Sequence, residues 1–154
     1  MIFQRSSELA IRMAVFLAPL PTGKLSPVRE IAAHIGVSEA YLAKISQRLV
    51  SAGIVRSVSG PGNGLALRQD PDRIDLAAIV VATQGSIGSD RCVLGLEACS
   101  DNHPCALHSQ WLPLRRRIVE LLEKTTLGDL VCSIQPGVEG VVSADLVRQL
   151  SERG

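Results

Sequence analysis

Apolar residues recur every three or four positions in three stretches within the first third of the chain, the spacing that places them on one face of an α-helix. In the first stretch these positions are Leu9, Ala10, Met13, Val15, Phe16 and Leu17. Ser6 or Ser7 can cap a helix at its start, and Pro19 and Pro21 end it. We therefore expect a first amphipathic helix with a buried aliphatic face.

The second and third stretches predict two helices joined by a glycine turn. A capping serine, Ser26, followed by proline at the first helical position is typical of a helix start, so we expect a short helix at about 27–34 that ends at Gly36. Ser38 then caps a longer helix at about 39–52. Its predicted buried positions are Leu42, Ile45, Leu49 and Val50. Two helices separated by such a turn form the helix-turn-helix pattern.

A β-hairpin is predicted directly after the second of these helices. The run 54–58 is rich in β-branched residues, and the run 65–68 follows a Ser-Gly-Pro-Gly-Asn-Gly loop at 59–64. Glycine and proline in this arrangement are typical of a reversal between two short strands. A hairpin in this position would be the wing of a winged helix-turn-helix.

Two more helical patterns follow the hairpin. One covers 76–83 and ends at Gly85, and the other covers 111–124. The longer one carries apolar residues on one side and three consecutive arginines, 115–117, elsewhere. Because little else in the sequence can cover its apolar side, we expect a partner subunit to do so.

These patterns predict a mainly α-helical fold with a small β-hairpin wing. We expect a winged helix-turn-helix domain at residues 1–70, a cysteine-bearing loop with a long dimerisation helix at 71–132, and a C-terminal tail at 133–154. No pattern in the tail indicates its role.

Composition adds a charge asymmetry to this picture. Of the 154 residues, 46% are hydrophobic but only 3% are aromatic, so the core must be aliphatic. Residues 1–70 hold eight Lys and Arg against four Asp and Glu, or +4, whereas residues 71–154 hold eight against eleven, or −3. A basic first half is a weak indication of a polyanion partner. No apolar run reaches the length of a membrane span and no signal peptide is evident, so we expect a cytoplasmic protein.

Three cysteines and a histidine lie within 17 residues, as Cys92-x6-Cys99-x5-Cys105-x2-His108. Thiolates repel one another, so gathering them favours a bound cation, either a metal ion or an iron–sulfur cluster. Wide gaps let a loop wrap a cofactor larger than one ion, which favours the cluster. Cys132 lies outside the motif and is interpreted as a small core residue.

Three other interpretations of these cysteines remain open. Structural zinc usually uses tighter cysteine pairs than these. A disulfide framework needs an oxidising compartment. Buried and unreactive thiols are also common in protein cores.

Taken in order, five segments resemble the winged-helix iron–sulfur transcriptional repressors of the IscR and NsrR type. They are ELAIRMAVFLA, the helix pair SPVREIAAHIGVSEAYLAKISQRLVSAGIVRSV, the wing GPGNGLAL, IDLAAIV and the cysteine loop. The resemblance extends to about Val131. It implies a homodimer with the long helix at its seam, and a DNA-binding regulator that senses iron–sulfur status, redox state or nitric oxide.

The resemblance also implies ligands. By position, Cys92, Cys99 and Cys105 correspond to the three thiolate ligands. The fourth would be His108, as in the subgroup with a [2Fe–2S] cluster, or Glu8 of the partner subunit, as in nitric-oxide sensors with a [4Fe–4S] cluster. We favour His108, because imidazole in a thiolate-rich site suits a two-iron centre and this residue is local to Cys105.

As a DNA reader, the second helix of the pair would enter the major groove, and a dimer would present two such helices to a palindromic site. The side chains expected at the bases are Ser38, Glu39, Tyr41 and Lys44, with Gln47 and Arg48 nearer the backbone. Relatives often place an arginine just before the wing turn, where this chain has Ser59. Arg56 is the expected substitute.

Other classes of function find less support. The sequence contains no catalytic triad, carboxylate pair or phosphate-binding loop, so an enzyme, including a redox or metal-dependent one, is disfavoured. A cluster-free regulator of the same fold would bind zinc or form a disulfide among Cys92, Cys99 and Cys105 when oxidised.

Overall fold

The computed structural model of the chain describes residues 3–21, 23–87, 92, 94 and 100–133. Its elements, in chain order, are α1 (Arg5–Leu17), α2 (Val28–Ile35), α3 (Glu39–Ser51), β1 (Val55–Val58), β2 (Gly64–Leu67), the 3-10 turn η1 (Pro71–Arg73), α4 (Leu76–Gln84), α5 (His108–Lys124) and α6 (Leu127–Cys132). This mainly helical chain with one small hairpin confirms the predicted fold class. Cys99 and nearly all of the predicted tail, from residue 134 onward, lie outside the described residues.

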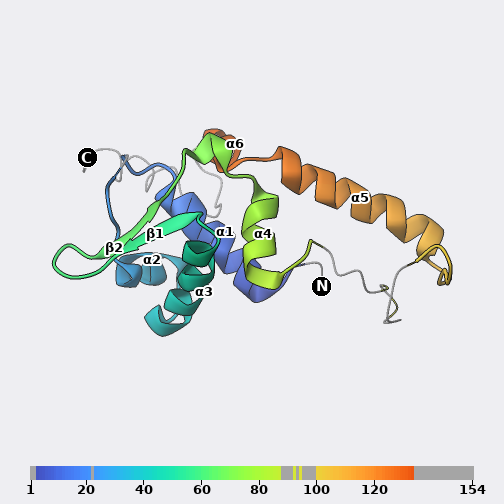
Figure 1. Cartoon of the computed structure of the whole chain (residues 1–154), viewed down its shortest axis with the longest axis horizontal. Coiled ribbons are helices and arrows are strands. Elements are labelled where there is room, and N and C mark those ends of the chain that lie inside the picture. The colour runs from blue at the N-terminus through green and yellow to red at the C-terminus, as the bar shows by residue number, and fades with distance from the viewer. Residues whose placement is uncertain (1–2, 22, 88–91, 93, 95–99, 134–154) are drawn as a thin grey trace.

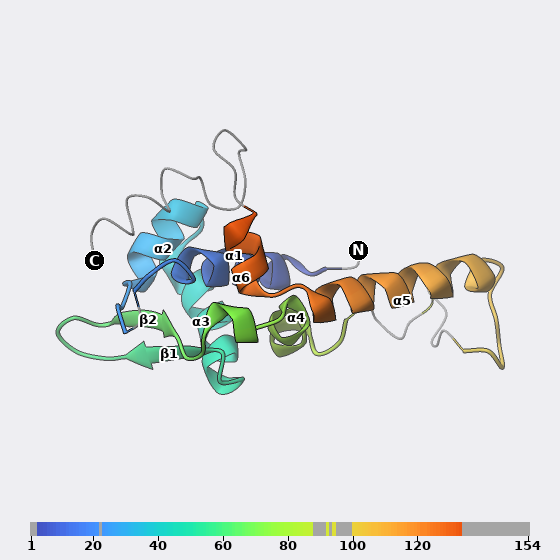
Figure 2. The same ribbon diagram turned by 90° about the horizontal axis from the view of Figure 1, so that it is seen from above.

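Helix α1 is the centre of the body, because α2, α3, α4, α6 and β2 all contact it. The hairpin and α2 lie at one end of the body, and α4 lies beside α1 (Figure 1). Helix α5 extends away from the body in both views, with its C-terminal end nearest to α6 (Figures 1 and 2). None of the described helices is both long enough and apolar enough to cross a membrane.

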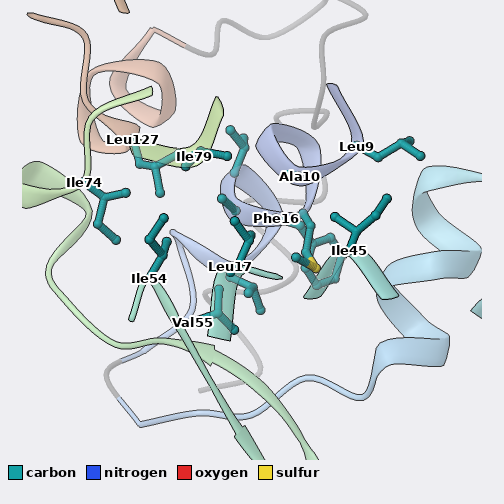
Figure 3. Close-up of a cluster of buried hydrophobic side chains, with 14 of the residues drawn as sticks. Leu9, Ala10, Phe16, Leu17, Ile45, Ile54, Val55, Ile74, Ile79 and Leu127 are labelled. Atoms are coloured by element: carbon teal, nitrogen blue, oxygen red, sulfur yellow. The ribbon is translucent and has the colours of Figure 1, made fainter. Parts of the chain in front are cut away.

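The core is aliphatic, as the composition predicts. Fully buried side chains such as Leu9 on α1, Val55 on β1 and Ile79 on α4 belong to one cluster, and Leu127 of α6 closes it (Figure 3). Burying this apolar surface is the main term that stabilises the fold. Side chains from before and after residue 70 share this core, which fixes α4 and α6 against the helix-turn-helix.

The start of α1 differs from the prediction that Ser6 or Ser7 caps it. The cap position is Gln4, which makes no side-chain cap bond. Ser7 lies inside the helix and is fully buried, where its hydroxyl lies 2.8 Å from Thr83 Oγ1 of α4. A distant polar partner therefore replaces the local backbone N–H that a capping serine would use.

The helix-turn-helix forms largely as the sequence predicts. Gly36 ends α2 with a φ of +79°, a left-handed conformation that glycine adopts without a steric cost. The Ser38 hydroxyl caps α3 by accepting a bond from the backbone N–H of Tyr41 at 3.3 Å. The prediction that Ser26 caps α2 is wrong, because the backbone of Ser26 instead exchanges two hydrogen bonds with Leu65, of 2.9 and 2.8 Å.

The wing is an antiparallel pair in which Val55 lies opposite Leu67 and Val58 lies opposite Gly64. The Ser26–Leu65 bonds attach β2, close to the wing turn, to the residues that precede α2. Gly64 permits this approach, since a Cβ there would lie 2.7 Å from the backbone C and O of Ser26. The wing is therefore held at a fixed position beside the helix-turn-helix.

Helix α5 begins at His108, three residues before the predicted start at Trp111. The extra turn forms because the N–H of Trp111 donates to the carbonyl of Leu107, with an N···O distance of 2.8 Å. Pro113 lies inside this helix, where it has no N–H to donate to the carbonyl of Ser109. Its first residue is thus the predicted ligand His108, which places the end of the cysteine segment on a helix.

Candidate nucleic-acid interface and cysteine segment

Helix α3 has a buried face and an open face. Leu42, Ile45 and Leu49 are buried, as predicted. The polar side chains predicted to read DNA lie on the opposite side and are exposed: Ser38, Glu39, Tyr41, Lys44 and Gln47. The structure therefore brings these five predicted residues together on one accessible surface, which suits contact with a large partner.

An open hollow of about 360 Å³ separates the start of α3 from the wing. Glu39 of α3, Ser59 and Asn63 of the wing loop, and Arg29 of α2 are among its lining residues. Arg29 was missed in the sequence analysis, although an exposed cation in the first turn of a helix-turn-helix is a signal that could have indicated it. Together, α2, α3 and the wing form one concave surface.

Two predicted DNA contacts have protein partners. Arg56 Nη2 donates to the carbonyl of Gly23 at 3.1 Å, so one end of this guanidinium holds the loop between α1 and α2. Arg48 Nη1 donates to the carbonyl of Thr83 at 2.6 Å, which joins α3 to α4. Both arginines therefore hold neighbouring parts of the fold against the DNA-reading elements.

The cysteine segment, residues 92–108, meets the fold at its two ends. Cys92 is only 5% exposed and His108 only 8%, whereas Cys105 is partly exposed. The N–H of His108 donates to the carbonyl of Cys105 at 3.0 Å, so these two predicted ligands belong to one turn. Cys99 lies outside the described residues, so three of the four predicted ligands can be placed. The interpretation of Cys132 as a core residue is wrong: it is exposed at the end of α6, whose buried residues are Leu127 and Gly128.

The imidazole of His108 has a carboxylate partner that the sequence analysis missed. His108 Nε2 lies 2.9 Å from Asp101 Oδ1, within hydrogen-bond distance. A carboxylate on one ring nitrogen fixes the tautomer and orientation of a histidine, as it does for many metal-ligating histidines. An acidic residue in the same loop was the available signal for this pair.

The alternative ligand Glu8 lies on α1 between two arginines. Its Oε1 is 2.8 Å from Arg5 Nη1 and 3.0 Å from Arg12 Nη2, and its side chain is 42% exposed. Arg5 Nη1 also donates to Glu8 Oε2 at 2.9 Å, so both carboxylate oxygens have a guanidinium partner on the same helix. Glu8 is therefore held within its own helix.

Helix α5 presents a row of apolar side chains at alternating spacings of four and three. The row comprises Leu107, Trp111, Leu114, Ile118 and Leu121. Leu114 is 52% exposed and Leu121 is 64% exposed, whereas Leu122 is buried in the core cluster. Trp111 and Ile118 are partly buried, and Ile118 also packs against the core cluster. A stripe with this heptad-like spacing and exposed leucines is the pattern of a helix-to-helix interface.

No three His, Cys, Asp or Glu side chains among the described residues are grouped closely enough to hold a metal ion. Cys99, the central cysteine of the motif, is not among these residues. The donor set itself suits iron–sulfur chemistry, because thiolates with one imidazole are established cluster ligands. His108 is buried and lies beside the exposed carboxylate of Asp101, whose side chain is 84% exposed, and this pair has the form of an oriented histidine ligand.

The fold and this surface define a winged helix-turn-helix protein of the transcription-factor class. Residues 3–133 match the Rrf2 family, described as iron-dependent transcriptional regulators, and the chain belongs to that family. The resemblance in the sequence analysis is thereby confirmed.

Particular relatives agree with this assignment. The chain is 36% identical over 105 residues to the HTH-type transcriptional regulator IscR of Yersinia pseudotuberculosis, a match that covers 68% of this chain and 63% of that protein. It thus spans less than two thirds of the length of that relative. These relatives are transcriptional regulators and not enzymes.

Solved structures show the same fold. The global cysteine regulator CymR of B. subtilis superimposes with a TM-score of 0.72 at 24% identity, over 88% of this chain and 99% of that chain. IscR of T. potens gives a TM-score of 0.67 at 22% identity, over 89% of this chain and 94% of that one.

Proposed function

We propose that this protein is a DNA-binding transcriptional repressor that carries an iron–sulfur cluster in its cysteine segment and acts as a cytoplasmic homodimer. The observation that carries the proposal is the open polar face of α3 beside an anchored wing. Membership of a family of iron-dependent regulators supports the class of function.

In this proposal α3 enters the major groove of DNA. Ser38, Glu39 and Tyr41 lie in or just before its first turn, the part of a recognition helix that contacts base edges. Lys44 and Gln47, on the same exposed face, reach the bases or the sugar–phosphate backbone. The wing, with Ser59 at its turn, follows the adjacent minor groove.

The cluster would be held by Cys92, Cys99, Cys105 and His108. If His108 donates its Nε2–H to Asp101, its lone pair is on Nδ1, which is then the ligating nitrogen. When bound, such a cluster changes charge on oxidation or reduction and is lost when its ligands are displaced. We favour [2Fe–2S], with Glu8 of the partner subunit and [4Fe–4S] as the alternative.

The apolar stripe of α5 supports a homodimer. Two copies packed along this stripe would cover Leu114 and Leu121 and present two α3 helices to a palindromic DNA site. The two halves of such a site would then be read by identical surfaces.

Selection of DNA from a random pool of duplexes tests this function. We expect the protein to enrich a palindromic sequence and to lose affinity steeply as salt is raised, because phosphates supply much of the binding. Lys44→Ala should weaken binding or relax the preference for the selected sequence. Binding that is independent of sequence would contradict the proposal.

Ligand variants separate the two candidates for the fourth position. His108→Cys should keep the cluster but shift its visible spectrum, since a thiolate replaces an imidazole. Glu8→Gln should leave the spectrum nearly unchanged. The reverse pattern, with Glu8 essential and His108 dispensable, would establish the intersubunit carboxylate and contradict our assignment.

A cluster-free thiol regulator is the second candidate. The accessible part of the motif favours it, because Cys105 is partly exposed and an exposed thiol can be oxidised. Such a protein would be colourless and would form a disulfide under mild oxidant.

A further inference from the structure

Arg48 lies on the last turn of α3, and its side chain is directed to α4. Its Nη1 donates to the carbonyl of Thr83 at 2.6 Å. Thr83 is the second-last residue of α4, where backbone carbonyls have no partner within the helix and carry the negative end of the helix dipole. A guanidinium is well suited to this position, because its bond to the carbonyl is assisted by charge.

The same residue of α4 also reaches α1. The side chain of Thr83 is 5% exposed, and its Oγ1 lies 2.8 Å from the hydroxyl of the fully buried Ser7. Ser7 Oγ in turn lies 2.7 Å from Oε1 of Gln84, which also accepts the backbone N–H of Gln4 at 3.0 Å. Ser7, Arg48, Thr83 and Gln84 thus form a polar cluster that joins three helices.

Such a cluster is a specific connection at the edge of the aliphatic core, where Ser7 and Thr83 are buried, Gln84 is partly buried and Arg48 is exposed. Apolar contacts between α3 and α4 are tolerant of small rotations, whereas a buried hydroxyl that loses its partner is left with an unsatisfied bond. The polar cluster therefore favours one orientation of the C-terminal end of α3 relative to α1 and α4.

Small changes of that orientation matter at the other end of α3. The helix has 13 residues, so it is about 20 Å long, and a rotation of about 5° at one end moves the other by roughly 1.7 Å. A displacement of that size breaks hydrogen bonds to base edges while leaving long-range attraction to phosphates nearly unchanged.

We propose that Arg48 is a positioning residue that sets the sequence specificity of α3 through its bond to Thr83, and that it is not a phosphate contact. This role rests on the proposed function, in which α3 reads DNA. It gives Arg48 a different task from the backbone contact expected from its place on the helix.

The test uses Arg48→Met, which removes the donor and keeps an unbranched side chain. Affinity is measured for a duplex selected by the parent chain and for an unrelated duplex, between about 50 and 200 mM salt. We expect the ratio of the two affinities to fall by about fivefold or more. The slope of log affinity against log salt should remain that of the parent chain.

Three further variants make the result specific. Arg48→Lys keeps a cation that can reach the carbonyl of Thr83, so its ratio of affinities for the selected and unrelated duplexes should lie between those of Arg48→Met and the parent chain. Ser7→Ala removes an uncharged, fully buried member of the polar cluster and should lower the ratio in the same direction. Arg73→Met removes an exposed arginine on η1 as a matched control, and should keep the ratio of the parent chain.

Two results would overturn the proposal. If Arg48→Met weakens both duplexes equally and lowers the salt slope by about one, Arg48 is a phosphate contact. If the ratio is unchanged in both Arg48→Met and Ser7→Ala, the polar cluster has no part in specificity. Should Arg48→Met fail to fold by circular dichroism, Arg48→Lys and Ser7→Ala decide the question. A parent chain that selects no sequence contradicts the proposed function itself, and this role falls with it.

Discussion

Gly64 is a residue at which the wing lies close to the backbone that precedes the helix-turn-helix. A Cβ at this position would lie 2.7 Å from backbone C and O atoms of Ser26, and backbone cannot move aside as a side-chain tip can. We predict that Gly64→Ala lowers the free energy of unfolding by about 1–3 kcal/mol, as overpacking usually does. Urea denaturation measures this change.

The neighbouring substitution Asn63→Ala provides the control, since Asn63 is an exposed residue of the same wing loop. It should keep the urea midpoint of the parent chain. A Gly64→Ala protein with an unchanged midpoint would show that the Ser26–Leu65 bridge yields easily, and would contradict the close packing described here.

His34 makes stability depend on pH. Its ring lies 5.3 Å from that of Phe16, and burial lowers the pKa of His34 below its ordinary value of 6.5. Between the lowered pKa of His34 in the folded chain and its ordinary value in the unfolded chain, the unfolded chain binds more protons than the folded chain. The contribution of neutral His34 to the free energy of unfolding is therefore complete above about pH 6.5 and is lost as the pH falls. We predict that the urea midpoint falls less between about pH 7.5 and 5.5 in His34→Gln than in the parent chain. An equal fall in both proteins would contradict this assignment.

At the scale of elements, α5 is the helix least covered by the rest of the chain. Leu114 and Leu121 are exposed on one stripe, and burying them against a second copy would remove apolar area from water. We predict that the parent chain is a dimer at roughly 10 µM and that Leu114→Glu or Leu121→Glu yields monomers, because each places charges at the seam. Sedimentation velocity measures the distribution.

Arg116→Glu is the matched control for these variants, because Arg116 lies on the same helix and about 200° around it from Leu114. It should remain dimeric. A monomeric parent chain, or a Leu121→Glu protein that still dimerises, would show that the stripe is not the interface.

Local sequence signals were sufficient for most elements. Gly36 and Ser38 mark the turn and the start of α3 because their effects reach only a few residues. The sequence could not indicate the roles of Ser7 and Arg48, since their partners on α4 are 76 and 35 positions away. Serine caps were predicted at α1 and α2 because a serine near a helix start looks the same in the sequence whether it caps the helix or bonds elsewhere.

In the candidate site, too, some residues follow from a local sequence pattern and others depend on their neighbours in the folded chain. The exposed face of α3 follows from its helical period, so Lys44 and its neighbours could be predicted. An acid in the cysteine segment and a cation in the helix pair are visible in the sequence, but the sequence does not show that Asp101 meets His108 or that Arg29 faces the wing.

At the scale of the whole molecule, the polar cluster includes Thr83 and Gln84 at the end of α4, nine and eight positions before Cys92 in the sequence. In the proposed function, binding of iron and sulfide by the cysteine segment changes the orientation of α3 through α4. Removing iron and sulfide should then change the affinity for the selected duplex by about 5- to 150-fold, the usual range of allosteric coupling. We predict that Arg48→Met reduces this factor, measured by fluorescence anisotropy. If the change in affinity on removal of iron and sulfide is the same in Arg48→Met as in the parent chain, the coupling does not pass through the polar cluster.

The central claim is that the cysteine segment binds an iron–sulfur cluster, and the content of iron and acid-labile sulfide in protein purified without oxygen tests it most directly. We predict coloured protein with about two irons and two sulfides per chain, a content abolished by Cys92→Ala, Cys99→Ala or Cys105→Ala and retained by Cys132→Ala. Colourless protein that contains zinc without sulfide, or no metal at all, would contradict the account.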